Sequence, residues 1–213
     1  MAKQARPVNH PQKITFHSTD GVSLVDMLQL PEPRFVTAED ARRQLRYIDR
    51  YVRDAAFDCK TAVVEQHYID RDHMEDHSVF YSKSLYPYPN YCRRVNFFSL
   101  ERGELWKEIR RLLNLRATAG ADAFRRDSAE FSRKYYIGFV VIKPLPGCPV
   151  GRTVLRCLPE ESGKSYVRKF HCAFDHDPHL LGLRLTVNGV PFQQQDLAGR
   201  SMSTCRNRKS LRI

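Results

Sequence analysis

The stretch that most constrains the fold of this chain is its most apolar one, residues 135–143. Its sequence, YYIGFVVIK, is short and rich in aromatic and β-branched residues. Lys134 precedes it, Lys143 is its last residue, and a proline follows immediately. This composition favours a buried β-strand over a helix. A second apolar run, residues 152–158, follows across a turn rich in proline and glycine. The sequence therefore predicts that these two strands pair and that the remaining strands add to them.

The pattern of the whole chain predicts an α+β fold, with a mostly antiparallel sheet and helices packed on it. The expected strands of the sheet are residues 61–69, 135–143, 152–158, 165–174 and 181–187. The expected helices are residues 37–56, 72–83, 100–116 and 122–132. Shorter extended segments are expected at residues 14–17, 22–25 and 93–98, with tight turns at Asp20-Gly21 and Asn188-Gly189. All of these elements are assigned to one domain, residues 14–199.

The net charge of +11 at pH 7 points to a polyanion as a candidate partner. Residues 1–13 carry three basic residues and residues 200–213 carry five, and neither segment contains an acidic residue. In residues 14–199 the basic residues outnumber the 24 acidic ones only slightly, so the excess charge lies mainly at the two ends. We expect both ends to be disordered basic tails that give weak, salt-sensitive contact with a polyanion.

A folded nucleic-acid-binding module is the alternative use of this charge. Lys107, Arg110 and Arg111 in the predicted helix 100–116 are its candidate phosphate-binding residues. The same three residues would equally form the solvated side of an amphipathic helix. The two hypotheses differ in where binding resides, because a folded surface would keep its affinity after both tails are removed.

The sequence shows no sign of export, membrane insertion or nucleotide binding. Its first residues lack an apolar signal segment, and no apolar run approaches the length of a membrane span. A cytoplasmic protein is expected, and its six cysteines should be reduced and mostly structural because none forms a Cys-x-x-Cys pair. Gly163-Lys164-Ser165 is similar to the end of a phosphate-binding loop, but Leu158 replaces the upstream glycine. No cofactor site is predicted.

Two groups of histidines are candidate metal ligands. His73 and His77 stand four residues apart on a predicted helix, but the glutamate between them is in neither of the positions that zinc proteases use. His171, His176 and His179 lie in one polar segment, although Pro178 disfavours a regular helix there. Solvated histidines account for both groups, and we expect no stoichiometric zinc in the purified protein.

Residues 190–198, with the sequence VPFQQQDLA, carry a resemblance to a known family. The segment follows a series of predicted strands and resembles the approach to the nucleophile helix of papain-like and bacteriocin-processing-type cysteine peptidases. The resemblance implies that Gln195 helps to form an oxyanion hole and that Cys205 is the nucleophile, its pKa lowered at a helix N-terminus. Gln195 and Cys205 are further apart than the corresponding pair in papain-like enzymes, and no histidine follows Cys205.

The sequence changes character from Arg200 onward. Residues 200–213 contain no acid and no apolar periodicity, although a buried helix is expected at this point. We therefore expect the chain to be the N-terminal portion of a cysteine-peptidase-like protein, interrupted by a frameshift or truncation and without a complete active site. Such an incomplete domain would expose apolar surface and tend to self-associate. A native basic tail is the alternative explanation of the same residues.

Overall fold

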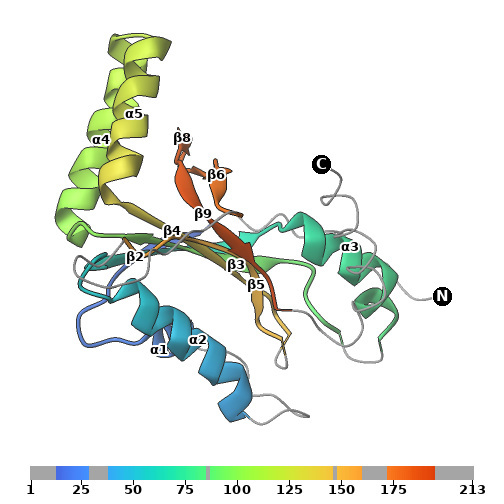
Figure 1. Cartoon of the computed structure of the whole chain (residues 1–213). Helices are drawn as coiled ribbons and strands as arrows, with labels where there is room; N and C mark the ends of the chain where they lie inside the picture. The colour runs from blue at the N-terminus through green and yellow to red at the C-terminus, as the bar shows by residue number, and fades with distance from the viewer. Residues whose placement is uncertain (1–12, 29–37, 85–86, 146–147, 160–171, 195–213) are drawn as a thin grey trace.

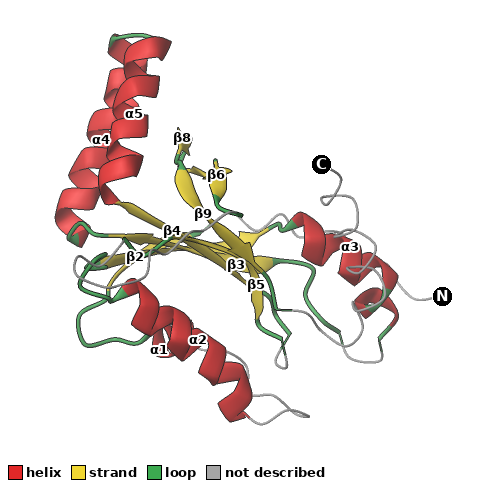
Figure 2. Ribbon diagram, viewed as in Figure 1, coloured by secondary structure: helices red, strands yellow, loops and turns green. Residues whose placement is uncertain are grey.

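The computed structural model of this protein describes residues 13–28, 38–84, 87–145, 148–159 and 172–194. They form a seven-stranded antiparallel sheet with helices packed on both faces, as Figures 1 and 2 show. The α+β fold predicted from the sequence is thereby confirmed. The order of the strands is β1-β2-β3-β4-β5-β9-β6. The strands are β1 (Ile14–Ser18), β2 (Thr61–Tyr68), β3 (Cys92–Phe98), β4 (Tyr136–Ile142), β5 (Val150–Arg156), β6 (Phe174–His176) and β9 (Val187–Phe192).

Strand β4 is the middle strand of the sheet, and all of its residues are buried. The predicted central strand is therefore correct, except that Tyr135 ends the preceding helix. Gly138 allows β4 to approach β5 closely, since its φ is +140° and a Cβ there would lie 2.2 Å from the backbone oxygen of Val154. Because side chains rarely tolerate that backbone conformation, glycine is required at the centre of this apolar run.

One face of the sheet packs against α1 (Leu24–Leu28) and α2 (Ala38–Val52). Leu45, Ile48 and Val52 follow helical spacing along α2 and are buried, as their spacing predicts. They pack against alternate residues of the strands. These are Ala62, Val64, Val95, Phe97, Val140 and Ile142.

The other face packs against α4 (Arg102–Thr118) and α5 (Ala121–Tyr135), a helix pair that extends well beyond the sheet in Figure 1. A small hairpin of β7 (His179–Leu180) and β8 (Leu183–Arg184) covers the same face. The Ser128 hydroxyl of α5 donates a hydrogen bond to the backbone oxygen of Arg184 (2.9 Å), which ties the helix pair to the hairpin. Buried residues of both elements complete the second core. They are Leu105, Ile109, Leu112, Phe131, Leu180 and Leu183.

Helix α3 (Arg71–Val79) and the 3-10 turn η1 (Tyr81–Lys83) occupy the segment predicted as a helix at 72–83. The Asp70 carboxylate caps α3 by accepting a hydrogen bond from the amide of His73 (3.1 Å). Among the helices of the described residues, none combines the length and the apolar character that crossing a membrane requires.

Near the N-terminus, one local prediction was wrong and another extended too far. Residues 22–25 are predicted to be extended, but α1 begins at Leu24 because the Ser23 hydroxyl accepts a hydrogen bond from the amide of Asp26 (3.2 Å). The helix predicted at 37–56 ends at Val52. Its last residues form a turn in which the Asp54 carboxylate accepts a hydrogen bond from the amide of Ala56 (3.0 Å).

The predictions near the C-terminus were correct only in part. Asn188-Gly189 is predicted as a turn, but both residues lie inside β9, where the backbone of Gly189 approaches that of Leu155 too closely for any side chain. The predicted strand 181–187 is divided between β8 and the start of β9. Residues 165–171 of the predicted strand 165–174 lie outside the described residues, as does Gly163-Lys164-Ser165, and of residues 172–174 only Phe174 belongs to a strand, β6.

Candidate functional site

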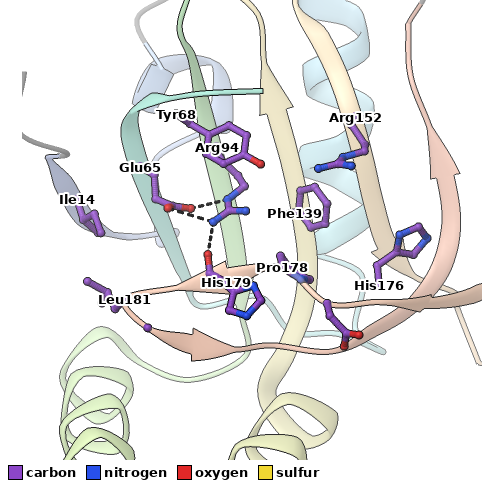
Figure 3. A pocket seen from close by; sticks show the side chains of 12 residues that line it. Ile14, Glu65, Tyr68, Arg94, Phe139, Arg152, His176, Pro178, His179 and Leu181 are labelled. Atoms are coloured by element: carbon purple, nitrogen blue, oxygen red, sulfur yellow. Dashed lines mark hydrogen bonds and ion pairs between the residues drawn. The ribbon is translucent and has the colours of Figure 1, made fainter. Parts of the chain in front are cut away.

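A polar pocket of about 610 Å³ opens on the face of the sheet that carries α4 and α5. Strands β2, β3, β4 and β5 contribute its floor, and the segment 176–182 lines its side, as Figure 3 shows. A volume of this size suits a small molecule, for which pockets of roughly 300–1,000 Å³ are usual. The polar and aromatic residues that line the pocket include Glu65, Tyr68, Arg94, Phe139, Arg152 and His176.

Glu65 on β2 and Arg94 on β3 form a buried ion pair at one end of this pocket. The two residues stand directly opposite each other in the antiparallel register, and both are almost completely buried. The guanidinium of Arg94 donates two hydrogen bonds to the Glu65 carboxylate, at 2.5 Å from Nε and 3.1 Å from Nη2. Each buried charge depends on the other for compensation, so the pair fixes the floor of the pocket.

The ion pair belongs to a longer chain of hydrogen bonds. The side-chain amide of Asn96 donates to the carboxylate of Glu65 (2.9 Å), and the hydroxyl of Tyr136 donates to the side-chain oxygen of Asn96 (2.9 Å). At its other end Arg94 donates to the backbone oxygen of His179, which attaches the β7–β8 hairpin to the sheet. Burial raises the pKa of Tyr136 well above its usual value. Burial alone would lower the pKa of Arg94, but the hydrogen bonds and charge of Glu65 outweigh it, so the pKa is raised and the pair stays ionised.

Arg152 on β5 lies on the other side of the pocket and has different surroundings. Its side chain is exposed, and no described carboxylate pairs with it. Its guanidinium lies over the ring of Phe139, 5.8 Å from the centroid. His176 lines the same pocket, and burial first and the positive charge of Arg152 second lower the pKa of its imidazole. Nε2 of His176 is buried without a hydrogen-bond partner among the described residues. This side of the pocket therefore combines an uncompensated cation with an unsatisfied imidazole nitrogen.

The acidic residues that line the pocket are already engaged. Glu65 belongs to the buried ion pair, and the Asp177 carboxylate accepts hydrogen bonds from Arg184 (2.7 Å) and Thr186 (2.8 Å). These two hydrogen bonds lower the pKa of Asp177, so it is ionised and partnered at neutral pH. Glu65 and Asp177 are thus paired with other arginines, and Arg152 is left as a pocket-lining cation that no described carboxylate contacts. An anion is the ligand that this arrangement favours.

The prediction that His73 and His77 are solvated was wrong for His73, whose side chain is completely buried. Their rings lie 6.0 Å apart on α3, and their Nε2 atoms form hydrogen bonds with the backbone oxygens of Pro89 (3.0 Å) and Tyr88 (2.9 Å). Burial lowers the pKa of His73, which favours its neutral form. Both rings therefore hold the segment 88–89 against α3.

The second group of histidines is only partly described. His176 and His179 both line the polar pocket, whereas His171 lies outside the described residues. Within the described ranges, no group of three or more histidine, cysteine, aspartate or glutamate residues could hold a metal ion.

Lys107, Arg110 and Arg111 lie on α4, as predicted, but each interacts with a neighbouring side chain. The partners are Glu104 (2.8 Å) for Lys107, the Trp106 ring (4.9 Å from its centroid) for Arg110, and Glu108 (3.0 Å) and Asp127 (2.9 Å) for Arg111. Three acidic residues thus offset the charge of these three cations. The arrangement matches the solvated side of an amphipathic helix, which the sequence offered as the alternative to a phosphate-binding patch.

A second concave surface, the apolar groove, lies on the opposite face between α2 and strands β5 and β9. It has a volume of about 260 Å³ and is lined chiefly by apolar and aromatic residues: Tyr47, Ile48, Tyr51, Leu155, Val190 and Phe192. Tyr47 is 65% exposed and Phe192 is 50% exposed. Strand β6 pairs only with the first half of β9, so Val190–Phe192 has no strand on its outer side among the described residues.

Gln194, just after β9, is attached to the ends of β4 and β5. Its backbone N–H donates to the backbone oxygen of Val150 (3.1 Å), and its side-chain oxygen accepts from the backbone N–H of Val150 (3.3 Å). The buried Lys143 donates to its backbone oxygen (3.5 Å). Gln195 and Cys205, the candidates for the oxyanion hole and the nucleophile, lie outside the described residues.

The described cysteines are free thiols, and two of them are deeply buried. Burial raises the pKa of Cys59 to about 12 and raises that of Cys92 as well. A thiol with so high a pKa is protonated at neutral pH and a poor nucleophile. Cys59 and Cys92 thus have the structural role that the sequence predicts.

Apart from His176 and His179, the residues that line the polar pocket were not among the candidates predicted from the sequence. A signal did exist, because Glu65 directly follows the apolar run Ala62–Val64 and Arg94 directly precedes the apolar Val95, so both charged residues belong to strands with buried apolar residues. Their pairing depends on the register of β2 and β3, which sequence patterns do not reveal. Comparisons with protein families, with characterised proteins and with solved structures found no match for this chain.

Proposed function

We propose that this α+β domain is a non-catalytic part of a cysteine-peptidase-like protein and holds the segment that leads into the nucleophile helix. The observation that carries this proposal is the attachment of Gln194 to Val150 and Lys143. Gln195, which matches the oxyanion-hole glutamine of the resembling families, is the next residue along the chain. A fixed backbone beside such a residue would preorganise its amide for binding a developing negative charge.

The apolar groove supports the same proposal. It lies beside the last residues of β9, so a unit that follows this strand would be close to it. Tyr47 and Phe192 are large and substantially exposed, and packing such a unit on them would remove apolar surface from water. The groove is therefore the expected contact surface between this domain and a peptidase-like unit.

The DNA sequence beyond codon 198 provides the most direct test of this proposal. The DNA that follows codon 198 should contain, in one of the three forward frames, an apolar helix-patterned continuation with a cysteine near its start and a histidine further on. Stop codons in every frame, together with a stable monomer, would contradict the proposal.

The groove can be tested separately in the chain itself. If it is a contact surface without its partner, it should cause weak self-association, and Phe192→Ser should reduce that association in sedimentation experiments. Phe174→Ser is the matched control, because Phe174 is similarly exposed (53%) but does not line the groove. Equal effects of the two substitutions would show that the groove is not the contact surface.

The nucleic-acid alternative has a test of its own. The cations of α4 are offset by acidic neighbours, so we expect polyanion binding to reside in residues 1–13 and 200–213. A protein lacking both segments should lose most of its binding to a DNA or RNA oligonucleotide at physiological salt. Binding that survives the truncation would favour a folded nucleic-acid-binding surface.

A further inference from the structure

We propose that the polar pocket binds a small carboxylate that carries an aromatic or apolar body, and that Arg152 holds the carboxylate group. This site lies on the opposite face of the sheet from the apolar groove and does not depend on the proposed peptidase-like partner. The proposal rests on three properties of the pocket, namely its charge, its aromatic floor and its unsatisfied nitrogen.

The charge of the pocket assigns the anion to Arg152. Arg94 also lines the pocket, but its guanidinium is neutralised by Glu65. Asp177 is partnered by Arg184 and Thr186. A guanidinium without a carboxylate presents a planar fork of donors, which matches the two oxygens of a carboxylate.

The floor of the pocket supplies contacts for the remainder of the ligand. The ring of Phe139 lies beneath Arg152, and the ring of Tyr68 stands near Arg94, 4.3 Å from the guanidinium carbon to the ring centroid. Ile14 and Leu181 add apolar atoms at the edge. A ligand with an aromatic or branched apolar body would cover these residues while its carboxylate faces Arg152, so both parts of the molecule contribute to binding.

His176 gives the carboxylate a second candidate partner. Its Nε2 is buried without a hydrogen-bond partner among the described residues, which is unfavourable for a polar atom. A carboxylate held by Arg152 would bring an acceptor close to this imidazole. The negative charge would also offset the effect of Arg152, so the pKa of His176 should rise when the ligand binds.

Calorimetric titration of the full chain with benzoate tests this assignment. Benzoate carries the carboxylate and the ring, benzamide keeps the shape without the charge, and acetate keeps the charge without the ring. We expect saturable binding of one benzoate per chain and weaker binding of the other two. Arg152→Met should weaken benzoate binding about tenfold or more, as loss of a charge-assisted hydrogen bond does.

Arg126→Met is the matched control, because Arg126 is an exposed arginine of α5 that does not line the pocket. It changes the net charge by the same amount and should alter benzoate affinity by less than about twofold at physiological salt. Equal weakening by the two substitutions would overturn the proposal. So would benzamide binding as tightly as benzoate, or no saturable benzoate binding up to about 10 mM.

Discussion

The polar pocket contains two arginines that approach the same ring from different sides. The guanidinium carbon of Arg94 lies 6.0 Å from the centroid of Phe139, and that of Arg152 lies 5.8 Å from it. Arg94 is buried and bound by the Glu65 carboxylate and the backbone oxygen of His179. Arg152 is exposed and has no carboxylate partner among the described residues. The same side chain thus stabilises the fold in one position and is available to a ligand in the other.

Removing Arg94 should have the largest effect. Arg94→Met leaves the carboxylate of Glu65 buried without its partner, and we expect the free energy of unfolding to fall by about 3–5 kcal/mol. Urea denaturation measures this change. The double variant Glu65→Met/Arg94→Met should recover much of the loss, because no buried charge is left uncompensated. An Arg94→Met protein as stable as the wild type would show that the ion pair does not hold the sheet.

Arg152→Met should hardly change stability. The side chain is exposed and makes no ion pair within the described residues, so the free energy of unfolding should change by less than about 0.5 kcal/mol. The same urea denaturation experiment provides the measurement. A loss comparable to that of Arg94→Met would remove the distinction between the two arginines.

The smallest effect is expected at His176. Burial and the charge of Arg152 hold its pKa below the ordinary value of about 6.5, so Arg152→Met should raise the pKa. Titration of the imidazole protons by NMR would detect the rise, and Arg126→Met should leave the pKa unchanged.

The pH dependence of stability follows from the direction of this shift. The depressed pKa favours neutral His176 in the folded protein, so its contribution to stability is fully present above pH 6.5. That contribution is lost as the pH falls below 6.5 towards the folded-state pKa. The loss should be smaller in Arg152→Met, and an identical loss in both proteins would indicate that the two residues are not neighbours.

Much of the fold could be predicted from the sequence because local patterns determine it. The apolar run that became β4 and the helical spacing of Leu45, Ile48 and Val52 were both sufficient to place buried elements. Asn188-Gly189 was misassigned because the same pair of residues suits a tight turn and a close approach of two strands. The close contact of Gly189 with the backbone of Leu155 distinguishes the strand from the turn, and Leu155 is distant in sequence.

The polar pocket could not be predicted because its residues come from separate strands. Glu65 and Arg94 meet only through the register of β2 and β3, and Arg152 reaches the same pocket from β5. Histidine spacing, by contrast, made His73 and His77 candidate metal ligands or solvated side chains, and it did not reveal that both rings bind backbone oxygens. Spacing along one helix reveals which residues share a face but not which partners they find in the folded chain.

The stability of the wild type and of Arg152→Met, with and without benzoate, tests the division between the two arginines most directly. At a benzoate concentration ten times its dissociation constant for the wild type, the free energy of unfolding of the wild type should rise by about 1.4 kcal/mol. The rise in Arg152→Met should be below about 0.5 kcal/mol, although both proteins are equally stable without ligand. An equal rise in both proteins, or no rise in the wild type, would contradict the assignment of Arg152 as the residue that binds the ligand.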